Sequence, residues 1–72
     1  MKKYTSLGDL ARELKMNKSK LAYYFGLGLI KPTSTVSGMN IYDSEKTTKR
    51  IRIIEEMQAK GKTLKDIKES MK

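Results

Sequence analysis

The chain has 72 residues, with 16 Lys or Arg and 8 Asp or Glu, so its formal net charge is +8. It contains no cysteine and no histidine, which excludes disulfides, thiolate metal sites and the commonest general base. A chain of this length buries about 60% of the surface that its unfolded form exposes, which predicts one thin domain over residues 1–72. No apolar run approaches the ~20 residues of a membrane span and no secretory signal is evident, so we expect a soluble, cytoplasmic protein.

Two short helices are predicted near the N-terminus. The first has Thr5 or Ser6 as its cap and an apolar stripe at helical spacing, made of Leu7, Leu10, Ala11 and Leu14. The second begins after the cap residue Asn17 and has an inner face made of Leu21, Tyr24 and Phe25. Gly26 and Gly28 are expected to stop it, since a glycine commonly follows the last residue of a helix. Two such helices joined by a short turn predict a helix-turn-helix.

A β-hairpin is predicted next. Residues 29–32 are expected to be extended, because the residue before a proline is pushed out of the α region. Ile41 and Tyr42 are strand-forming residues, and the polar, turn-rich residues 33–40 between these segments are expected to form the tip. A two-stranded hairpin beside a helix-turn-helix is called a wing.

Two further helices complete the prediction. Ser44 is expected to cap a long helix that ends at Gly61. One side of this helix consists of Ile51, Ile54, Met57 and Gln58. Thr63 and Asp66 have the spacing of a capping box for a last helix, whose inward residues are Leu64, Ile67 and Met71. The predicted fold class is a mostly α winged helix-turn-helix, with about four helices and a two-stranded wing.

Basic residues are concentrated in two stretches that contain no acid. No acidic residue occurs between Glu13 and Asp43, where four lysines are found: Lys15, Lys18, Lys20 and Lys31. The second stretch, residues 46–54, contains Lys46, Lys49, Arg50 and Arg52. A merely solvated surface normally mixes both signs of charge. The distribution therefore favours a phosphate-facing surface on residues 15–52 over chance clustering.

The outer face of the second predicted helix is the best candidate for contact with such a partner. At about 100° per residue, with Leu21 inward, this face consists of Ser19, Ala22 and Tyr23, with Lys20 at its edge. An exposed Tyr23 beside lysines can contact sugar, phosphate or a base methyl group; the alternative is a residue partly buried under the wing. Tyr24 is predicted to lie in the core, with its hydroxyl reaching the surface.

The N-terminal half of this helix has the short or flexible donors that a helix entering the major groove requires, namely Asn17, Lys18, Ser19 and Lys20. Asn17 is better explained as a helix cap than as a base contact. Lys18 and Lys20 favour phosphate contact over base reading, because lysine lacks the planar fork of arginine.

Catalysis has little support in the sequence. The acidic pairs Asp9 with Glu13 and Glu55 with Glu56 are predicted to be solvated, whereas paired carboxylates need burial to separate their pKa values. No Gly-Lys-Ser/Thr loop is present to bind a nucleotide. We therefore expect a protein that is not an enzyme and that needs no cofactor or metal.

Several motifs in order resemble the DNA-binding domain of the MerR family of bacterial transcription regulators, over residues 4–71. They are Leu-Gly-Asp-Leu-Ala at 7–11, Leu-Ala-Tyr-Tyr at 21–24, Gly-Leu-Ile-Lys-Pro at 28–32, Gly38 with Tyr42, and Gly-Lys-Thr-Leu-Lys-Asp-Ile at 61–67. The resemblance implies a winged helix-turn-helix that places its second helix in the major groove of double-stranded DNA and its wing against the backbone. It also implies binding as a dimer to inverted repeats. The positions that it marks for contact are Lys18, Ser19, Lys20, Tyr23 and Tyr24.

The chain departs from the family pattern at several of these positions. The family usually has Arg where Ala22 stands, Glu or Asp where Phe25 stands, and Tyr-Arg in the wing where Met39 and Asn40 stand. The loss of two arginines weakens the expected binding to DNA phosphates. We expect Lys31, Lys49 and Arg50 to offset this loss.

Family regulators dimerise through a long helix beyond this domain and then carry an effector module, and the chain ends at Lys72, before either. No small-molecule effector is therefore expected within this chain, and a homodimer or a cooperative assembly on DNA remains an open expectation. Two other functions stay open as well. One is an excisionase-like architectural DNA binder, and the other is a protein-interaction module, which Ala22, Met39 and Asn40 favour.

Overall fold

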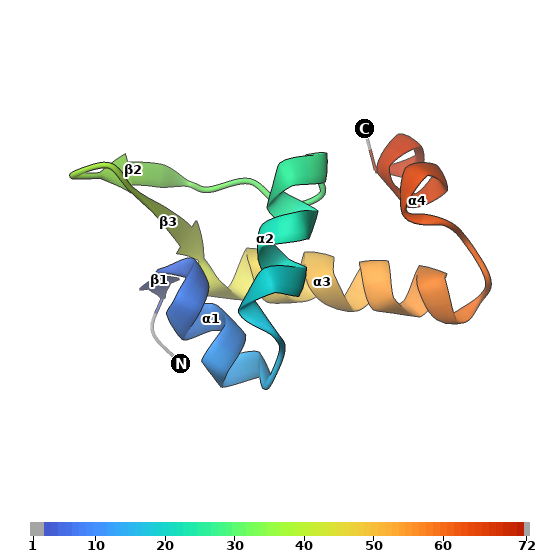
Figure 1. Ribbon diagram of the computed structural model, residues 1–72, viewed down its shortest axis with the longest axis horizontal. Helices are drawn as coiled ribbons and strands as arrows, with labels where there is room; N and C mark the ends of the chain where they lie inside the picture. Colours follow the sequence, from blue (N-terminus) through green and yellow to red (C-terminus); the bar gives the residue numbers. More distant parts are fainter. Residues whose placement is uncertain (1–2, 72) are drawn as a thin grey trace.

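The computed structural model describes residues 3–71, and within this range the chain forms four helices and three strands (Figure 1). In chain order they are β1 (Tyr4–Thr5), α1 (Leu7–Leu14), α2 (Lys18–Leu27), β2 (Ser34–Val36), β3 (Met39–Asp43), α3 (Ser44–Ala59) and α4 (Leu64–Ser70). The predicted fold class, a mostly α winged helix-turn-helix, is confirmed. None of the helices between residues 3 and 71 is long and apolar enough to cross a lipid bilayer.

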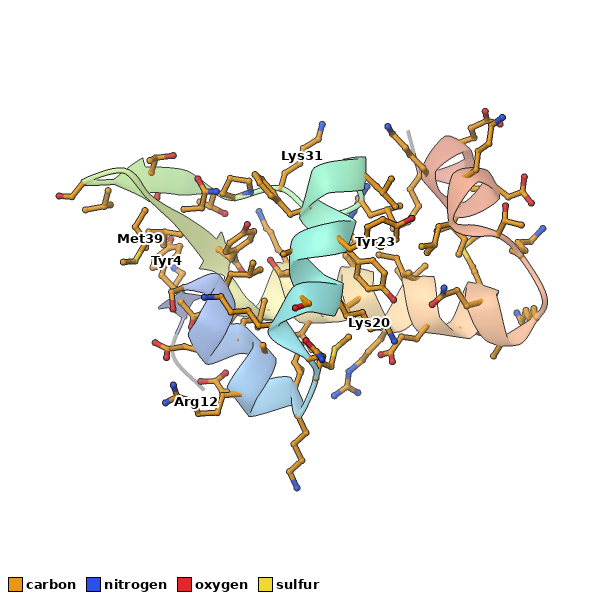
Figure 2. All side chains as sticks on the ribbon, viewed as in Figure 1. Tyr4, Arg12, Lys20, Tyr23, Lys31 and Met39 are labelled. Atoms are coloured by element: carbon orange, nitrogen blue, oxygen red, sulfur yellow. The ribbon has the colours of Figure 1, made fainter. Side chains whose placement is uncertain are left out.

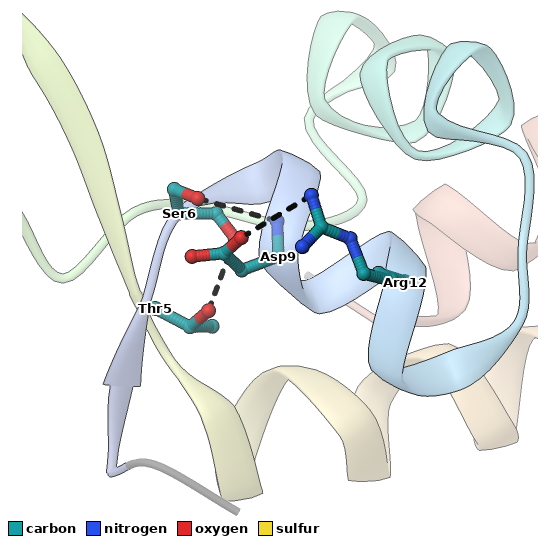
Figure 3. A network of polar contacts seen from close by, with 4 residues as sticks. All are labelled: Thr5, Ser6, Asp9 and Arg12. Atoms are coloured by element: carbon teal, nitrogen blue, oxygen red, sulfur yellow. Dashed lines mark hydrogen bonds and ion pairs between the residues drawn. The ribbon is translucent and has the colours of Figure 1, made fainter.

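The start of α1 is fixed by a side-chain cap. Of the two predicted cap residues, Ser6 is the one used: its Oγ accepts a hydrogen bond from the Asp9 main-chain N–H at 3.2 Å (Figure 3). The same figure shows the Thr5 hydroxyl donating to the Ser6 carbonyl oxygen at 3.3 Å and Arg12 paired with Asp9 at 3.9 Å. The ion pair is exposed and contributes little, so the cap sets the helix start.

The bounds of α2 confirm one predicted signal and correct another. Asn17 is the cap, and its Oδ1 accepts a hydrogen bond from the Ser19 main-chain N–H at 2.8 Å. Gly28 ends the helix at φ +82°, a left-handed conformation that favours glycine. Gly26 lies inside the helix, so the prediction that it stops α2 is wrong. Only the residue that must adopt positive φ needs to be glycine there.

The three strands form one antiparallel sheet in the order β1-β3-β2. Ser37 and Gly38 make the turn of the β2–β3 wing, with φ values of 50° and 78° that suit a two-residue hairpin. The strands therefore extend into residues 33–40, which were predicted to be the tip, whereas residues 29–32 form no strand. The additional strand β1 was not predicted, because two residues show no alternation that could be recognised.

Asp43, rather than Ser44, caps α3: its Oδ1 accepts a hydrogen bond from the Lys46 main-chain N–H at 2.9 Å. Ser44 is the first helical residue and is buried. The helix ends at Ala59, just before Gly61 at φ +90°. At the start of α4, Thr63 Oγ1 accepts from the Asp66 main-chain N–H at 3.2 Å, as the capping spacing predicted.

The core lies where α1, α2, the sheet, α3 and α4 meet. It consists of Leu10, Ala11, Leu21, Tyr24, Leu29, Ile30, Tyr42, Ile51, Ile54 and Ile67. Phe25 was predicted to belong to it but is 39% exposed. Its ring instead lies nearly perpendicular to the buried Tyr42 ring, with centroids 6.5 Å apart and an interplanar angle of 87°. The small core is filled by Leu21 and Tyr24 on this face of α2, and Phe25 covers its rim.

Candidate nucleic-acid interface

The outer face of α2 is exposed as the helical spacing predicted. Lys18, Ser19, Lys20 and Ala22 are exposed, and Tyr23 retains 57% of its accessible surface. Figure 2 shows Lys20 and Tyr23 beside α2, away from Met39 and Tyr4 on the sheet. Because Leu21 and Tyr24 are buried behind this face, its side chains are presented by a helix whose orientation is set by the core.

Tyr24 lies in the core, so its ring offers no contact surface to a partner. It is 1% exposed, and its hydroxyl donates a hydrogen bond to Oε1 of Gln58 in α3 at 3.2 Å. The Nζ of Lys20 lies 5.9 Å from the centroid of the Tyr24 ring. Tyr24 thus positions α2 against α3 and also attracts the Lys20 ammonium toward its ring.

Asn17, the cap of α2, and Lys18, its first residue, both make contacts within the helix-turn-helix. The Asn17 side-chain oxygen is used by the cap, in agreement with the helix-cap interpretation. The Lys18 side chain lies along Gly8 of α1, because a Cβ added at Gly8 would be 3.8 Å from Lys18 Cε and Nζ. A larger residue at position 8 would thus contact the Lys18 side chain directly.

The two candidate residues of the wing, Met39 and Asn40, lie on opposite faces of β3. Met39 is 57% exposed and pairs across the hairpin with Val36, which is 58% exposed. Asn40 points to the other face of β3, where its Oδ1 accepts a long hydrogen bond of 3.5 Å from the Thr35 hydroxyl. Tyr4 of β1 pairs with Asp43 of β3 and shares the outer face of the sheet with Met39.

The three remaining candidates fall into two places. Lys49 is paired with Glu45 at 3.3 Å on the exposed side of α3. Lys31 and Arg50 line one surface pocket together, and the Arg50 Nε donates a hydrogen bond to the Leu29 carbonyl oxygen. The sequence interpretation missed a third cation in that pocket, Lys68 of α4. Sequence spacing alone could not have found it, because only the packing of α4 against the core brings Lys68 beside the end of α2.

Few of the basic residues are neutralised within the structure. In residues 3–71 the ion pairs are Arg12 with Asp9, Lys49 with Glu45 and Lys60 with Glu56. The basic residues around α2 therefore have no carboxylate partner in the described part of the chain. They form a positively charged region suited to a polyanion.

One buried group, the Tyr42 hydroxyl, has a shifted pKa. Burial raises the pKa of the Tyr42 hydroxyl above its usual value, and the nearby Asn40 side chain lowers it by a smaller amount. The hydroxyl makes no hydrogen bond of good geometry within residues 3–71. In the same part of the chain, no group of three or more acidic, His or Cys residues is placed to hold a metal ion.

Comparison with known proteins decides the family. Residues 5–72 match the family described as MerR HTH family regulatory proteins. The chain belongs to the MerR family. It is 40% identical over 62 residues to the mercuric resistance operon regulatory protein of Bacillus cereus, an alignment that covers 85% of this chain and 46% of that protein. The chain thus spans about half the length of this MerR-family relative, and no solved structure matches it significantly.

Proposed function

We propose that this chain is the DNA-binding part of a MerR-type transcription regulator and binds double-stranded DNA in a sequence-specific way. In this proposal α2 enters the major groove and the wing lies against the backbone. The observation that carries it is the outer face of α2. There Lys20 and the largely exposed Tyr23 project from a helix held by Leu21 and Tyr24 in the core.

The size and chemistry of this face fit the groove. The major groove is about 12 Å wide and admits one α-helix, whose N-terminal half reaches the base edges. Ser19 and the Asn17 amide nitrogen are short donors there, since only the Asn17 oxygen is used by the cap. Lys18 and Lys20 contact phosphates, and Tyr23 contacts sugar or a thymine methyl group.

The wing and the region behind it hold the backbone. Met39 packs against a deoxyribose of the DNA backbone, and the Asn40 side-chain amide donates to a phosphate. These two residues take the place of the Tyr-Arg pair that is usual in the family. Lys31, Lys49 and Arg50 add positive charge on either side. The protein acts as a homodimer or as a cooperative assembly on DNA, and the similarity to a regulatory protein of an operon supports transcription as the process.

A titration against random-sequence duplexes, with selection and sequencing of the bound fraction at several salt concentrations, tests the proposal. Each phosphate contact contributes about −0.9 to the slope of log affinity against log salt. A steep slope with an enriched motif supports the proposal, and the symmetry of that motif reports dimeric binding. A steep slope without enrichment would replace it with an architectural role, and no binding at low salt would end it.

Two variants separate the interface from general charge. Lys20→Ala should weaken binding to the selected site several-fold with the fold intact. Lys60→Ala removes the same charge at the C-terminal end of α3, where Lys60 is paired with Glu56 at 3.4 Å. It should bind nearly as tightly as the unmodified chain. Equal losses in both variants would contradict the placement of α2 in the groove.

A protein-interaction module is the second candidate, and one observation favours it. Tyr4, Val36 and Met39 are each about half exposed and lie on the outer face of the sheet. A partner protein that docks there would bind with little dependence on salt, because apolar contacts are not screened by ions. Replacing Met39 by Ser should abolish such binding while leaving the salt slope on DNA unchanged.

A further inference from the structure

Three cations from three separate segments meet at the C-terminal end of α2. Lys31 follows the helix, Arg50 comes from α3 and Lys68 comes from α4, and together with Gly28 and Met71 they line one surface pocket. Figure 2 shows Lys31 extending past this end of α2, whereas Lys20 lies beside its other half. A neighbouring pocket shares Lys31, Arg50 and Met71 and adds a fourth cation, Lys46, together with one carboxylate, Asp43.

We infer that Lys31, Arg50 and Lys68 form a binding site for a phosphate group, which we call the Gly28 cluster. The inference deepens the proposed function, because the phosphate of a DNA backbone is one source of this group. A free phosphorylated small molecule is the other. The site adds Lys68 to the phosphate contacts expected from the sequence, so that α4 also contributes to them.

Arg50 is the oriented member of the cluster. It is half-buried, and its Nε donates to the Leu29 carbonyl oxygen, which holds the guanidinium plane in one orientation. That bond uses one of five N–H donors and leaves those of both terminal nitrogens. A planar fork held in this way matches two oxygens of one phosphate better than a mobile ammonium does.

Lys68 is directed to the same place by the packing of α4. Ile67 is fully buried, so α4 is fixed against the core next to Lys68. A Cβ placed on Gly28 would lie 3.6 Å from Lys68 Cε and 3.8 Å from its Nζ. The ammonium of this exposed residue therefore lies over the end of α2.

The charge of the cluster is only partly compensated by the protein, and Asp43, which lines the neighbouring pocket, is the carboxylate that the pockets place beside two of its members. None of the three side chains forms an ion pair within residues 3–71, and the pocket that all three line has no acidic residue. The C-terminal end of α2 supplies the opposing charge, equivalent to about −0.5. Three cations exceed this partial charge, and Asp43 in the neighbouring pocket is matched there by Lys46, so an anion is attracted rather than repelled.

Two measurements on the same variants test the cluster. The first is the salt dependence of binding to a selected duplex for Lys31→Ala, Lys68→Ala and the matched control Lys65→Ala, which lies in α4 outside the pocket. The second is the thermal midpoint of the DNA-free chain with inorganic pyrophosphate, compared with chloride at equal ionic strength. Binding to the folded state raises this midpoint.

A duplex phosphate at the cluster requires that Lys31→Ala and Lys68→Ala each reduce the salt slope by about 0.9 and that Lys65→Ala leaves it unchanged. A free ligand requires that pyrophosphate raises the midpoint of the unmodified chain and of Lys65→Ala but not of the other two variants. Either pattern supports the site. If Lys68→Ala matches Lys65→Ala in both measurements, the cluster does not bind phosphate. Failure of the chain to bind any duplex would remove the proposed function, and the pyrophosphate measurement would still decide the cluster.

Discussion

Arg50 in α3 donates a hydrogen bond from its Nε to the main-chain carbonyl oxygen of Leu29, across a sequence separation of 21 residues. This bond connects the longest helix to the segment that leaves α2 and leads to the wing. Leu29 and Ile30 are both buried, so the segment is held by its side chains on one side and by Arg50 on the other. The bond is therefore one of the contacts that hold the segment between α2 and the wing.

Arg50→Lys is predicted to lower the free energy of unfolding by about 1.5–3 kcal/mol, because the charge is kept but the planar donor to Leu29 is lost. Urea denaturation measures this change. Arg52→Lys, at an exposed position with no such bond, is the control and should change stability by less than about 0.5 kcal/mol. Equal effects in the two variants would show that the bond to Leu29 contributes nothing.

Leu21→Ala is predicted to lower the free energy of unfolding by about 2–5 kcal/mol, because Leu21 is fully buried and its removal leaves a cavity. Lys20→Ala, one residue away on the exposed side, should cost less than about 1 kcal/mol, the size of its attraction to the Tyr24 ring. Thermal denaturation of the two variants checks both values. A large loss for Lys20→Ala would contradict the assignment of the inner and outer faces.

Two buried tyrosines are predicted to respond oppositely to loss of the hydroxyl. Tyr24→Phe removes a donor to Gln58 and should cost about 0.5–1.5 kcal/mol. Tyr42→Phe removes a buried hydroxyl without a well-formed hydrogen bond, and it should be neutral or stabilise the fold by up to about 1 kcal/mol. Urea denaturation at neutral pH compares them. A loss in Tyr42→Phe as large as that in Tyr24→Phe would mean that the Tyr42 hydroxyl is bonded in solution.

The raised pKa of Tyr42 predicts a loss of stability in alkaline solution. Burial keeps the hydroxyl protonated in the folded state at a pH where the unfolded chain, with a tyrosine pKa of about 10, has released its proton. Stability is therefore fully present below about pH 10 and falls as the pH rises toward the folded-state pKa. Tyr42→Phe should lose less stability than the unmodified chain over this range. Parallel curves from pH 8 to pH 11 would contradict the prediction.

Gly26 inside α2 and Gly28 at its end form a matched pair. Gly28→Ala places a side chain at φ +82° and should cost about 1–2 kcal/mol. Gly26→Ala lies inside the helix with open space around the new Cβ, and it should stabilise by about 0.5–1 kcal/mol. Differential scanning calorimetry of both variants measures the contrast. Equal shifts would show that the helix does not end at Gly28 in solution.

Most features that depend on neighbours within one helical turn could be predicted from the sequence, although Asp43 rather than Ser44 caps α3 and Gly26 does not stop α2. Ser6, Asn17 and Thr63 cap their helices because the bonded N–H lies two or three residues away. The apolar spacing placed Leu21 inward and Tyr23 outward, since helix geometry alone sets their relative directions. These local rules were enough for the fold class and for the outer face of α2.

Features that depend on residues distant in the chain were decided by the tertiary structure. Phe25 has the helical spacing of a core residue, but in the structure it is partly exposed and its ring packs against that of the buried Tyr42, from a distant part of the chain. Strand β1 exists because β3 offers an edge for two residues to pair with. The tertiary structure likewise brings Lys68 close to Lys31 and Arg50, which are distant from it in the sequence. Sequence spacing determines on which side of its own helix a residue lies, whereas only the packing of α4 against the core determines what that side faces.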